Sequence, residues 1–192
     1  MTDEQPRAKP PNFLEVHADN HPDKVAVIGL ESSLTYGQLR ERARALAKSL
    51  YGLGVRPGDQ VALMTYNDPV QPQVSNALQY LEVGLVMVGY RMKPREIEYI
   101  VDNSDSRVLI FWHEFADRIV PHKDKYTKIL PGGFISFGGP QPSGAEDWEA
   151  LVQDPPDMDL DALPPAAEPG SSMIYTSGTT GRPKGAARRT DF

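Results

Sequence analysis

The chain has 192 residues, 40% of them hydrophobic and 24% charged, which is ordinary usage for one globular domain and too apolar for a disordered chain. A net charge of -6 excludes the broad positive field that gathers nucleic acid, and the absence of cysteine excludes disulfides, thiolate metal sites and cysteine nucleophiles. Neither a signal peptide nor a long apolar run occurs, so we expect a cytoplasmic protein without a transmembrane segment.

The first elements are short. Residues 1–11 are polar and rich in proline, which predicts a disordered N-terminal tail. Asn12 then caps a short helix that stops before Pro22, because the residue preceding proline avoids helical geometry. A strand is expected at residues 25–28.

A longer amphipathic helix follows. Thr35 and Gln38 have the spacing of a capping box, and apolar residues then recur with helical period as far as Leu50. Glycines and a Pro57-Gly58-Asp59 turn end this helix, and residues 61–64 form the next strand.

The alternation of strand and helix then continues. A helical stripe runs from Val70 to Leu81, and the continuous apolar run 85–88 suits a strand that is buried on both faces. Pro94 opens another helix, and residues 108–111 are again strand-like. Since parallel strands need long right-handed crossovers, this order predicts an α/β fold: a twisted, mainly parallel sheet flanked by helices.

The pattern changes towards the C-terminus. Ser143 and Glu146 have the spacing to cap a short helix that holds Trp148. Residues 154–170 contain five prolines and five acids and are predicted to be an extended connector. We therefore divide the chain into an α/β subdomain (12–153), this connector, and residues 171–192 as the start of a truncated second subdomain.

The most unusual segment follows a short strand at residues 173–175. Hydroxyl side chains supply donors, glycines let backbone N–H groups approach a ligand, and a lysine adds positive charge, which together suit a polyphosphate. A flexible linker is the alternative, but it would need neither the strand before it nor the proline beside the lysine. The candidate phosphate-binding residues are Thr176, Ser177, Gly178, Thr179, Thr180, Gly181 and Lys184.

Two other loop chemistries are disfavoured. Only two residues separate Gly178 from Gly181, and Lys184 is followed by glycine, which does not fit a Walker loop. Tyr175 stands where the nucleophile elbow of a serine hydrolase needs glycine, and no histidine follows.

The segment Tyr175–Gly185, YTSGTTGRPKG, resembles the phosphate-binding signature of the adenylate-forming superfamily of acyl-CoA synthetases, luciferases and peptide-synthetase adenylation domains. Upstream, residues 34–39 and 89–110 are similar to two softer blocks of that family in the same order. The resemblance implies the N-terminal part of the family's large domain, in the branch that activates fatty or aryl acids.

The resemblance also implies a two-step reaction. A carboxylate attacks the α-phosphorus of ATP with Mg²⁺, pyrophosphate leaves, and coenzyme A captures the acyl-adenylate. The partners are thus a small carboxylic acid, ATP and CoA, with no nucleic acid. The family's adenine, ribose and lysine motifs do not occur in this chain, so we expect a fragment that is inactive alone and that self-associates through its unpaired sheet edge. The alternative is a non-catalytic α/β nucleotide-binding or interaction module.

The remaining candidates have ordinary explanations. The four histidines lack ligand spacing, so we expect no metal site in the protein. Tyr66, Tyr90 and Trp112 could line an acyl pocket, although aromatic residues at strand ends are more often part of the core. We assign no catalytic residue.

Overall fold

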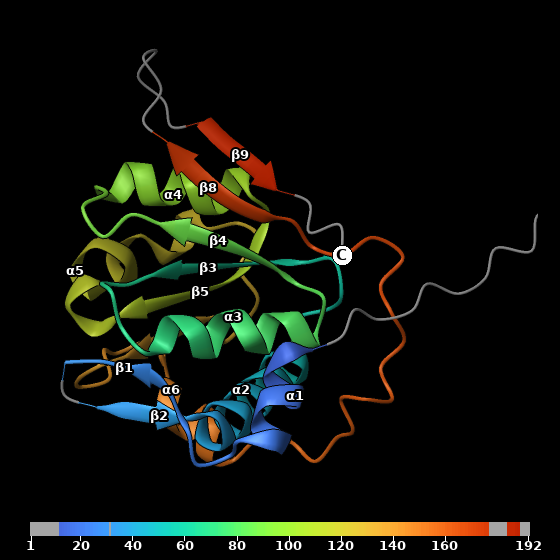
Figure 1. Ribbon diagram of the computed structural model, residues 1–192. Helices are drawn as coiled ribbons and strands as arrows, with labels where there is room; N and C mark the ends of the chain where they lie inside the picture. Colours follow the sequence, from blue (N-terminus) through green and yellow to red (C-terminus); the bar gives the residue numbers. More distant parts are fainter. Residues whose placement is uncertain (1–11, 31, 177–183, 189–192) are drawn as a thin grey trace, which may run out of the picture.

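The computed structural model describes residues 12–30, 32–176 and 184–188 (Figure 1). The helices are α1 (Phe13–Asn20), α2 (Tyr36–Gly52), α3 (Val70–Tyr80), α4 (Pro94–Asn103), α5 (Ala116–Ile119) and α6 (Trp148–Gln153), with 3₁₀ segments at His113–Phe115 and Val120–Lys125. The strands are β1 (Val25–Ile28), β2 (Ser33–Thr35), β3 (Gln60–Met64), β4 (Gly84–Val88), β5 (Ser106–Trp112), β6 (Phe134–Phe137), β7 (Glu146–Asp147), β8 (Ser172–Thr176) and β9 (Lys184–Arg188).

The main sheet has seven strands in the order β7-β6-β5-β3-β4-β8-β9. Neighbouring strands are parallel throughout, except that β9 runs antiparallel to β8 at one edge. Strands β1 and β2 form a separate antiparallel pair. The prediction of an α/β fold with a mainly parallel sheet is confirmed.

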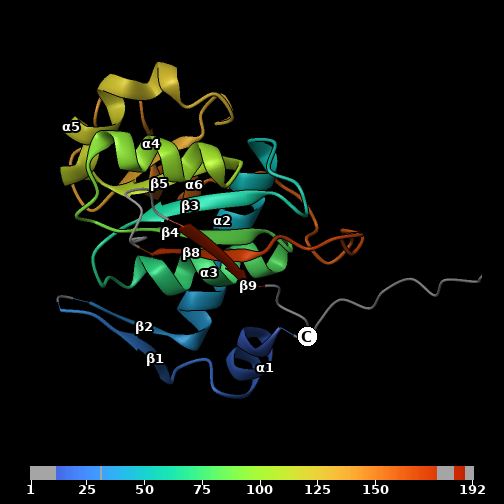
Figure 2. The same cartoon turned by 90° about the horizontal axis from the view of Figure 1, so that it is seen from above.

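Helices cover both faces of the sheet (Figures 1 and 2). Helices α1, α2, α3 and α6 bury one apolar core against one face, whereas α4 and the residues around α5 bury a second core against the other. Strand β3 lies between these layers and every residue in it is buried, as expected for a central parallel strand.

The predicted N-terminal cap was correct for α2 and wrong for α6. At α2 the Thr35 hydroxyl accepts the Gln38 N–H at 3.2 Å, and the Gln38 side chain accepts the Thr35 N–H at 2.9 Å. Helix α6 instead begins after Asp147, whose carboxylate accepts the Glu149 N–H. Glu146, predicted to belong to the helix, pairs with β6 as part of β7, and this pairing holds it extended.

The connector at residues 154–170 packs against the body of the protein. Leu160 is 1% exposed within the same core as α2 and α3. Further on, the carbonyl of Glu82 accepts the N–H of Gly170 at 2.9 Å, which brings the chain alongside β4 at the start of β8. Strands β8 and β9 therefore extend the sheet of residues 12–153, and the division into two subdomains stays a prediction.

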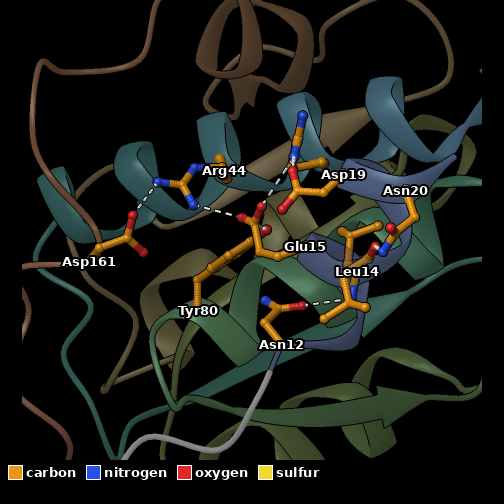
Figure 3. A network of polar contacts seen from close by, with 10 residues as sticks. Asn12, Leu14, Glu15, Asp19, Asn20, Arg44, Tyr80 and Asp161 are labelled. Carbon is orange, nitrogen blue, oxygen red and sulfur yellow. Dashed lines mark hydrogen bonds and ion pairs between the residues drawn. The ribbon is translucent and has the colours of Figure 1, made fainter. Parts of the chain in front are cut away.

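A network of charged side chains ties α1 and the connector to α2 and α3 (Figure 3). The Arg44 guanidinium lies 2.7 Å from a Glu15 oxygen on α1 and 2.9 Å from an Asp161 oxygen on the connector. The Tyr80 hydroxyl on α3 donates to the same Glu15 oxygen at 2.6 Å. Burial and the hydrogen bond to Glu15 raise the pKa of Tyr80, so this tyrosine remains a donor.

Candidate functional site

Strands β8 and β9 bring the two ends of the predicted phosphate-binding loop together. Thr176, the last residue of β8, pairs directly with Lys184, the first residue of β9. Of the seven candidate residues, only these two belong to the described part of the chain. The other five, from Ser177 to Gly181, lie outside it.

The base of this hairpin is fixed by one aromatic ring. Tyr175 is 9% exposed, and its hydroxyl donates to the Asn103 side chain at 2.9 Å. Burial raises the pKa of Tyr175, which keeps this donor protonated. A Cβ atom on Gly185 would lie 2.9 Å from the Cζ atom of the Tyr175 ring. Gly185 thus has a packing reason to be glycine, separate from any approach to a ligand.

The hairpin starts at the carboxyl edge of the parallel sheet. Because β8 runs parallel to β4, and β4 to β3, the ends of all three strands lie at this edge. The chain leaving β3 passes through α3 to β4, whereas the chain leaving the adjacent β5 passes through α5 to β6 on the other side. Open α/β sheets commonly bind ligands at such a divergence, which here lies between the ends of β3 and β5.

Aromatic side chains gather at the same edge. Tyr66 follows β3, Tyr90 follows β4 and Trp112 ends β5. The Tyr66 ring centroid lies 5.2 Å from that of Tyr90, 6.0 Å from that of Trp112 and 5.0 Å from that of Phe115. Tyr66 and Tyr90 are 40% and 41% exposed, whereas Trp112 is half-buried. The structure therefore brings the three predicted residues together, with two of them open to solvent.

Sequence reasoning missed two residues that position this edge. Asn103 holds Tyr175 although the two residues are 72 positions apart in the chain. Arg118 donates to the carbonyls of Tyr90 and Met92 at 2.9 and 3.0 Å. No local pattern marks either residue, because both act through contacts between distant segments.

The described residues contain no group of three or more histidine or acidic side chains arranged to hold a metal ion. Among the same residues, no helix is both long and apolar enough to cross a lipid bilayer.

Comparison with known proteins gives a consistent result. A family model described as AMP-binding enzyme matches residues 14–191. The chain is 31% identical over 180 residues to a 3-oxocholest-4-en-26-oate–CoA ligase of Rhodococcus rhodochrous, a match that covers 91% of this chain and 32% of the relative. It is 33% identical over 184 residues to a medium/long-chain-fatty-acid–CoA ligase of Mycolicibacterium smegmatis that also takes 3-oxocholest-4-en-26-oate. The chain spans about a third of the length of these curated relatives.

Solved structures agree on the fold. An anthranilate CoA ligase in complex with anthranoyl-AMP is similar with a TM-score of 0.81 and 26% identity, over 93% of this chain and 34% of that one. A fatty acyl CoA synthetase of Mycobacterium tuberculosis is similar with a TM-score of 0.73 and 24% identity, over 92% of this chain.

Proposed function

Because the chain belongs to the AMP-binding enzyme family, we propose that it forms part of an ATP-dependent ligase that joins a carboxylic acid to coenzyme A. In this reaction the carboxylate attacks the α-phosphorus of ATP, pyrophosphate leaves, and the thiol of coenzyme A displaces AMP from the acyl-adenylate. The names of the relatives cover fatty, steroid and aryl acids, so the proposed substrate is an apolar carboxylic acid.

The observation that carries this proposal is the pairing of Thr176 with Lys184 at the carboxyl edge of the sheet. It brings the two ends of the segment 177–183 together at the carboxyl ends of the parallel strands, which is the side of the sheet on which α/β folds bind ligands. Lys184 is exposed at the end of this loop. Its ammonium group is therefore free to approach a phosphate.

The chemical task of such a loop is to control charge. A carboxylate is repelled by a triphosphate, so donors and cations must hold the β- and γ-phosphates and stabilise the charge that builds on pyrophosphate. We assign this role to the N–H and hydroxyl groups of Thr176, Ser177, Gly178, Thr179, Thr180 and Gly181, and to Lys184. Mg²⁺ would arrive with ATP and neutralise part of its charge. No described residue is assigned to the metal, because the described residues offer no cluster of ligands for it.

The proposal is tested by the binding of MgATP to the 192-residue chain, followed by ³¹P NMR. We expect the β- and γ-phosphorus signals to broaden first, and Lys184→Ala to weaken binding by about 10-fold or more, since a charge-assisted hydrogen bond contributes roughly 1.5–3 kcal/mol. The matched control is Lys125→Ala, which removes an exposed lysine from the turn after α5 and should leave binding within about 2-fold. Equal affinity of Lys184→Ala and the unchanged chain would contradict the assignment.

The proposal also includes the location of the protein in the cell and its self-association. We place the protein in the cytoplasm, where ATP and coenzyme A are at hand, and cell fractionation tests this location. We also infer self-association, because β9 pairs with β8 alone among the residues that the structure describes, and the neighbouring Ile174 is 61% exposed. Sedimentation that does not change with protein concentration would contradict self-association.

A further inference from the structure

Four aromatic side chains at the carboxyl edge of the sheet form a partly exposed platform and are not simply core residues. The platform consists of Tyr66, Tyr90, Trp112 and Phe115. Phe115 is 1% exposed and Trp112 is half-buried, and both pack against the ring of Tyr66. The rings of Tyr66 and Tyr90 lie 5.2 Å apart at 53° to each other and are 40% and 41% exposed. Two aromatic rings are thus supported from one side and open to solvent on the other.

Polar contacts hold the platform in place. The Tyr66 hydroxyl lies 3.3 Å from a Glu114 oxygen, which orients the ring. Arg118 donates to the carbonyls of Tyr90 and Met92, and its guanidinium lies 4.5 Å from the centre of the Phe115 ring. Because the turn that carries Tyr90 is anchored in this way, a ligand that stacks on it would lose little binding energy to ordering the protein.

A positive charge flanks the platform. The Arg91 guanidinium lies 5.3 Å from the centre of the Tyr90 ring, and the residue is exposed. Within the described ranges, no carboxylate lies within salt-bridge distance of Arg91. One carboxylate at the platform is that of Glu114, which accepts a hydrogen bond from the Tyr66 hydroxyl at 3.3 Å. Exposed rings beside an unneutralised guanidinium suit a ligand that is both planar and anionic.

The platform is next to the candidate phosphate site. Tyr90 stands two residues beyond the end of β4, and β4 is the immediate neighbour of β8, whose last residue is Thr176. Adjacent strands lie roughly 4.8 Å apart. A ligand on the platform would therefore lie near Thr176, the last described residue before the candidate phosphate loop.

We propose that Tyr66, Tyr90 and Arg91 form a stacking site for a planar aromatic anion. The inference rests on the proposed function, which supplies two sources of this chemistry: the aryl group of a carboxylic acid, or an adenine nucleotide. In either case the ring system stacks on the face of one tyrosine and meets the other at its edge, since the two rings are inclined at 53° to each other. The carboxylate or phosphate meets the guanidinium of Arg91.

The test is an NMR titration of the 192-residue chain with 2-naphthoate and, separately, with AMP, both without Mg²⁺. We expect at least one of these anions to bind, and cyclohexanecarboxylate, which is anionic but not planar, to bind about 5-fold or more weakly. Tyr66→Ala and Tyr90→Ala should each weaken binding about 5-fold or more, whereas Tyr66→Phe, which keeps the ring, should stay within about 2-fold. Binding of 2-naphthoate alone identifies an aryl acid as the ligand, and binding of AMP alone identifies a nucleotide.

The chain offers a matched control at the opposite edge of the sheet. There the Arg56 guanidinium lies 4.0 Å from the centre of the Tyr51 ring, ahead of β3. Tyr51→Ala should leave both titrations unchanged. Equal weakening by Tyr51→Ala and Tyr90→Ala, equal binding of 2-naphthoate and cyclohexanecarboxylate, or no binding of either aromatic anion would overturn the proposal. Since 2-naphthoate carries no phosphate, its binding should survive Lys184→Ala, which separates this test from that of the proposed function.

Discussion

Two buried tyrosines differ in whether their hydroxyl group has a hydrogen-bond partner, and this difference decides how each affects the stability of the fold. Tyr175 uses its hydroxyl to hold α4 through Asn103, and its ring occupies the space that a side chain at Gly185 would need. Tyr126, in contrast, is buried without such a hydrogen bond in the described part of the chain. It is 4% exposed, and its hydroxyl has no hydrogen-bond partner among the residues that the structure describes. Such a group destabilises the fold, because it gave up its bonds to water without replacing them.

Tyr126→Phe should therefore leave the free energy of unfolding at pH 7 unchanged or raise it by about 1 kcal/mol. Burial, and then the charge of Glu98, raise the pKa of Tyr126 to about 12. Above the usual tyrosine pKa of about 10, the unfolded chain loses this proton while the folded chain keeps it, so stability falls as the pH rises between about 10 and 12. The variant should lose less stability than the unchanged chain over this range, as measured by urea unfolding at several pH values. The same pH dependence in both proteins would contradict the argument.

At the scale of elements, ion pairs attach the outer segments to the central helices. Arg44 on α2 bridges Glu15 on α1 and Asp161 on the connector, and its guanidinium also lies 5.3 Å from the centre of the Tyr80 ring. About a quarter of each of the Arg44 and Glu15 side chains is exposed, so these charges are screened less than surface pairs. One arginine on α2 thus bridges two segments, α1 and the connector, that lie far apart in the sequence.

Arg44→Met keeps the aliphatic stem and removes the charge. We expect a loss of about 1–3 kcal/mol in the free energy of unfolding, and an earlier loss of amide-exchange protection in α1 than in β3. Lys48→Met, on the same helix but without an ion pair among the described residues, is the control and should change stability by less than about 0.5 kcal/mol. Protection of α1 that is unchanged in Arg44→Met would show that the network is not what holds this helix.

These elements also show which parts of the fold could be predicted from the sequence and which could not. Periodicity and caps are local, and they predicted α2, α4 and the central strands. Strand β7 and the shifted start of α6 depend on pairing with β6, which no local pattern encodes. The composition of the loop after Thr176 pointed to phosphate chemistry, but Asn103 and Arg118 are tied to that edge by contacts across the fold. Local chemistry was therefore predictable from the sequence, and its positioning was not.

At the scale of the whole molecule, the connector belongs to the folded body. Its composition of proline and acid is typical of an extended linker, and nothing in that composition marks Leu160 as a core residue. In the structure Leu160 is 1% exposed and packs in the core shared by α2 and α3. The chain thereby returns to the sheet in a fixed position at β8, just before the candidate phosphate loop.

Leu160→Ala should lower the free energy of unfolding by about 2–5 kcal/mol, the usual cost of a cavity in a packed core. Thermal unfolding should remain a single transition at a lower midpoint, because the connector and the sheet share this core. Leu163→Ala, at a half-buried position of the same segment, should cost less. If Leu160→Ala leaves the midpoint unchanged, the connector is not part of the cooperative unit.

The measurement that bears most directly on this account is a crystal structure of the chain with ATP and Mg²⁺. We predict that the β- and γ-phosphates lie against the loop between β8 and β9, with an oxygen roughly 2.7–3.2 Å from Nζ of Lys184. A triphosphate seated anywhere else on the protein, with Lys184 facing solvent, would contradict the account.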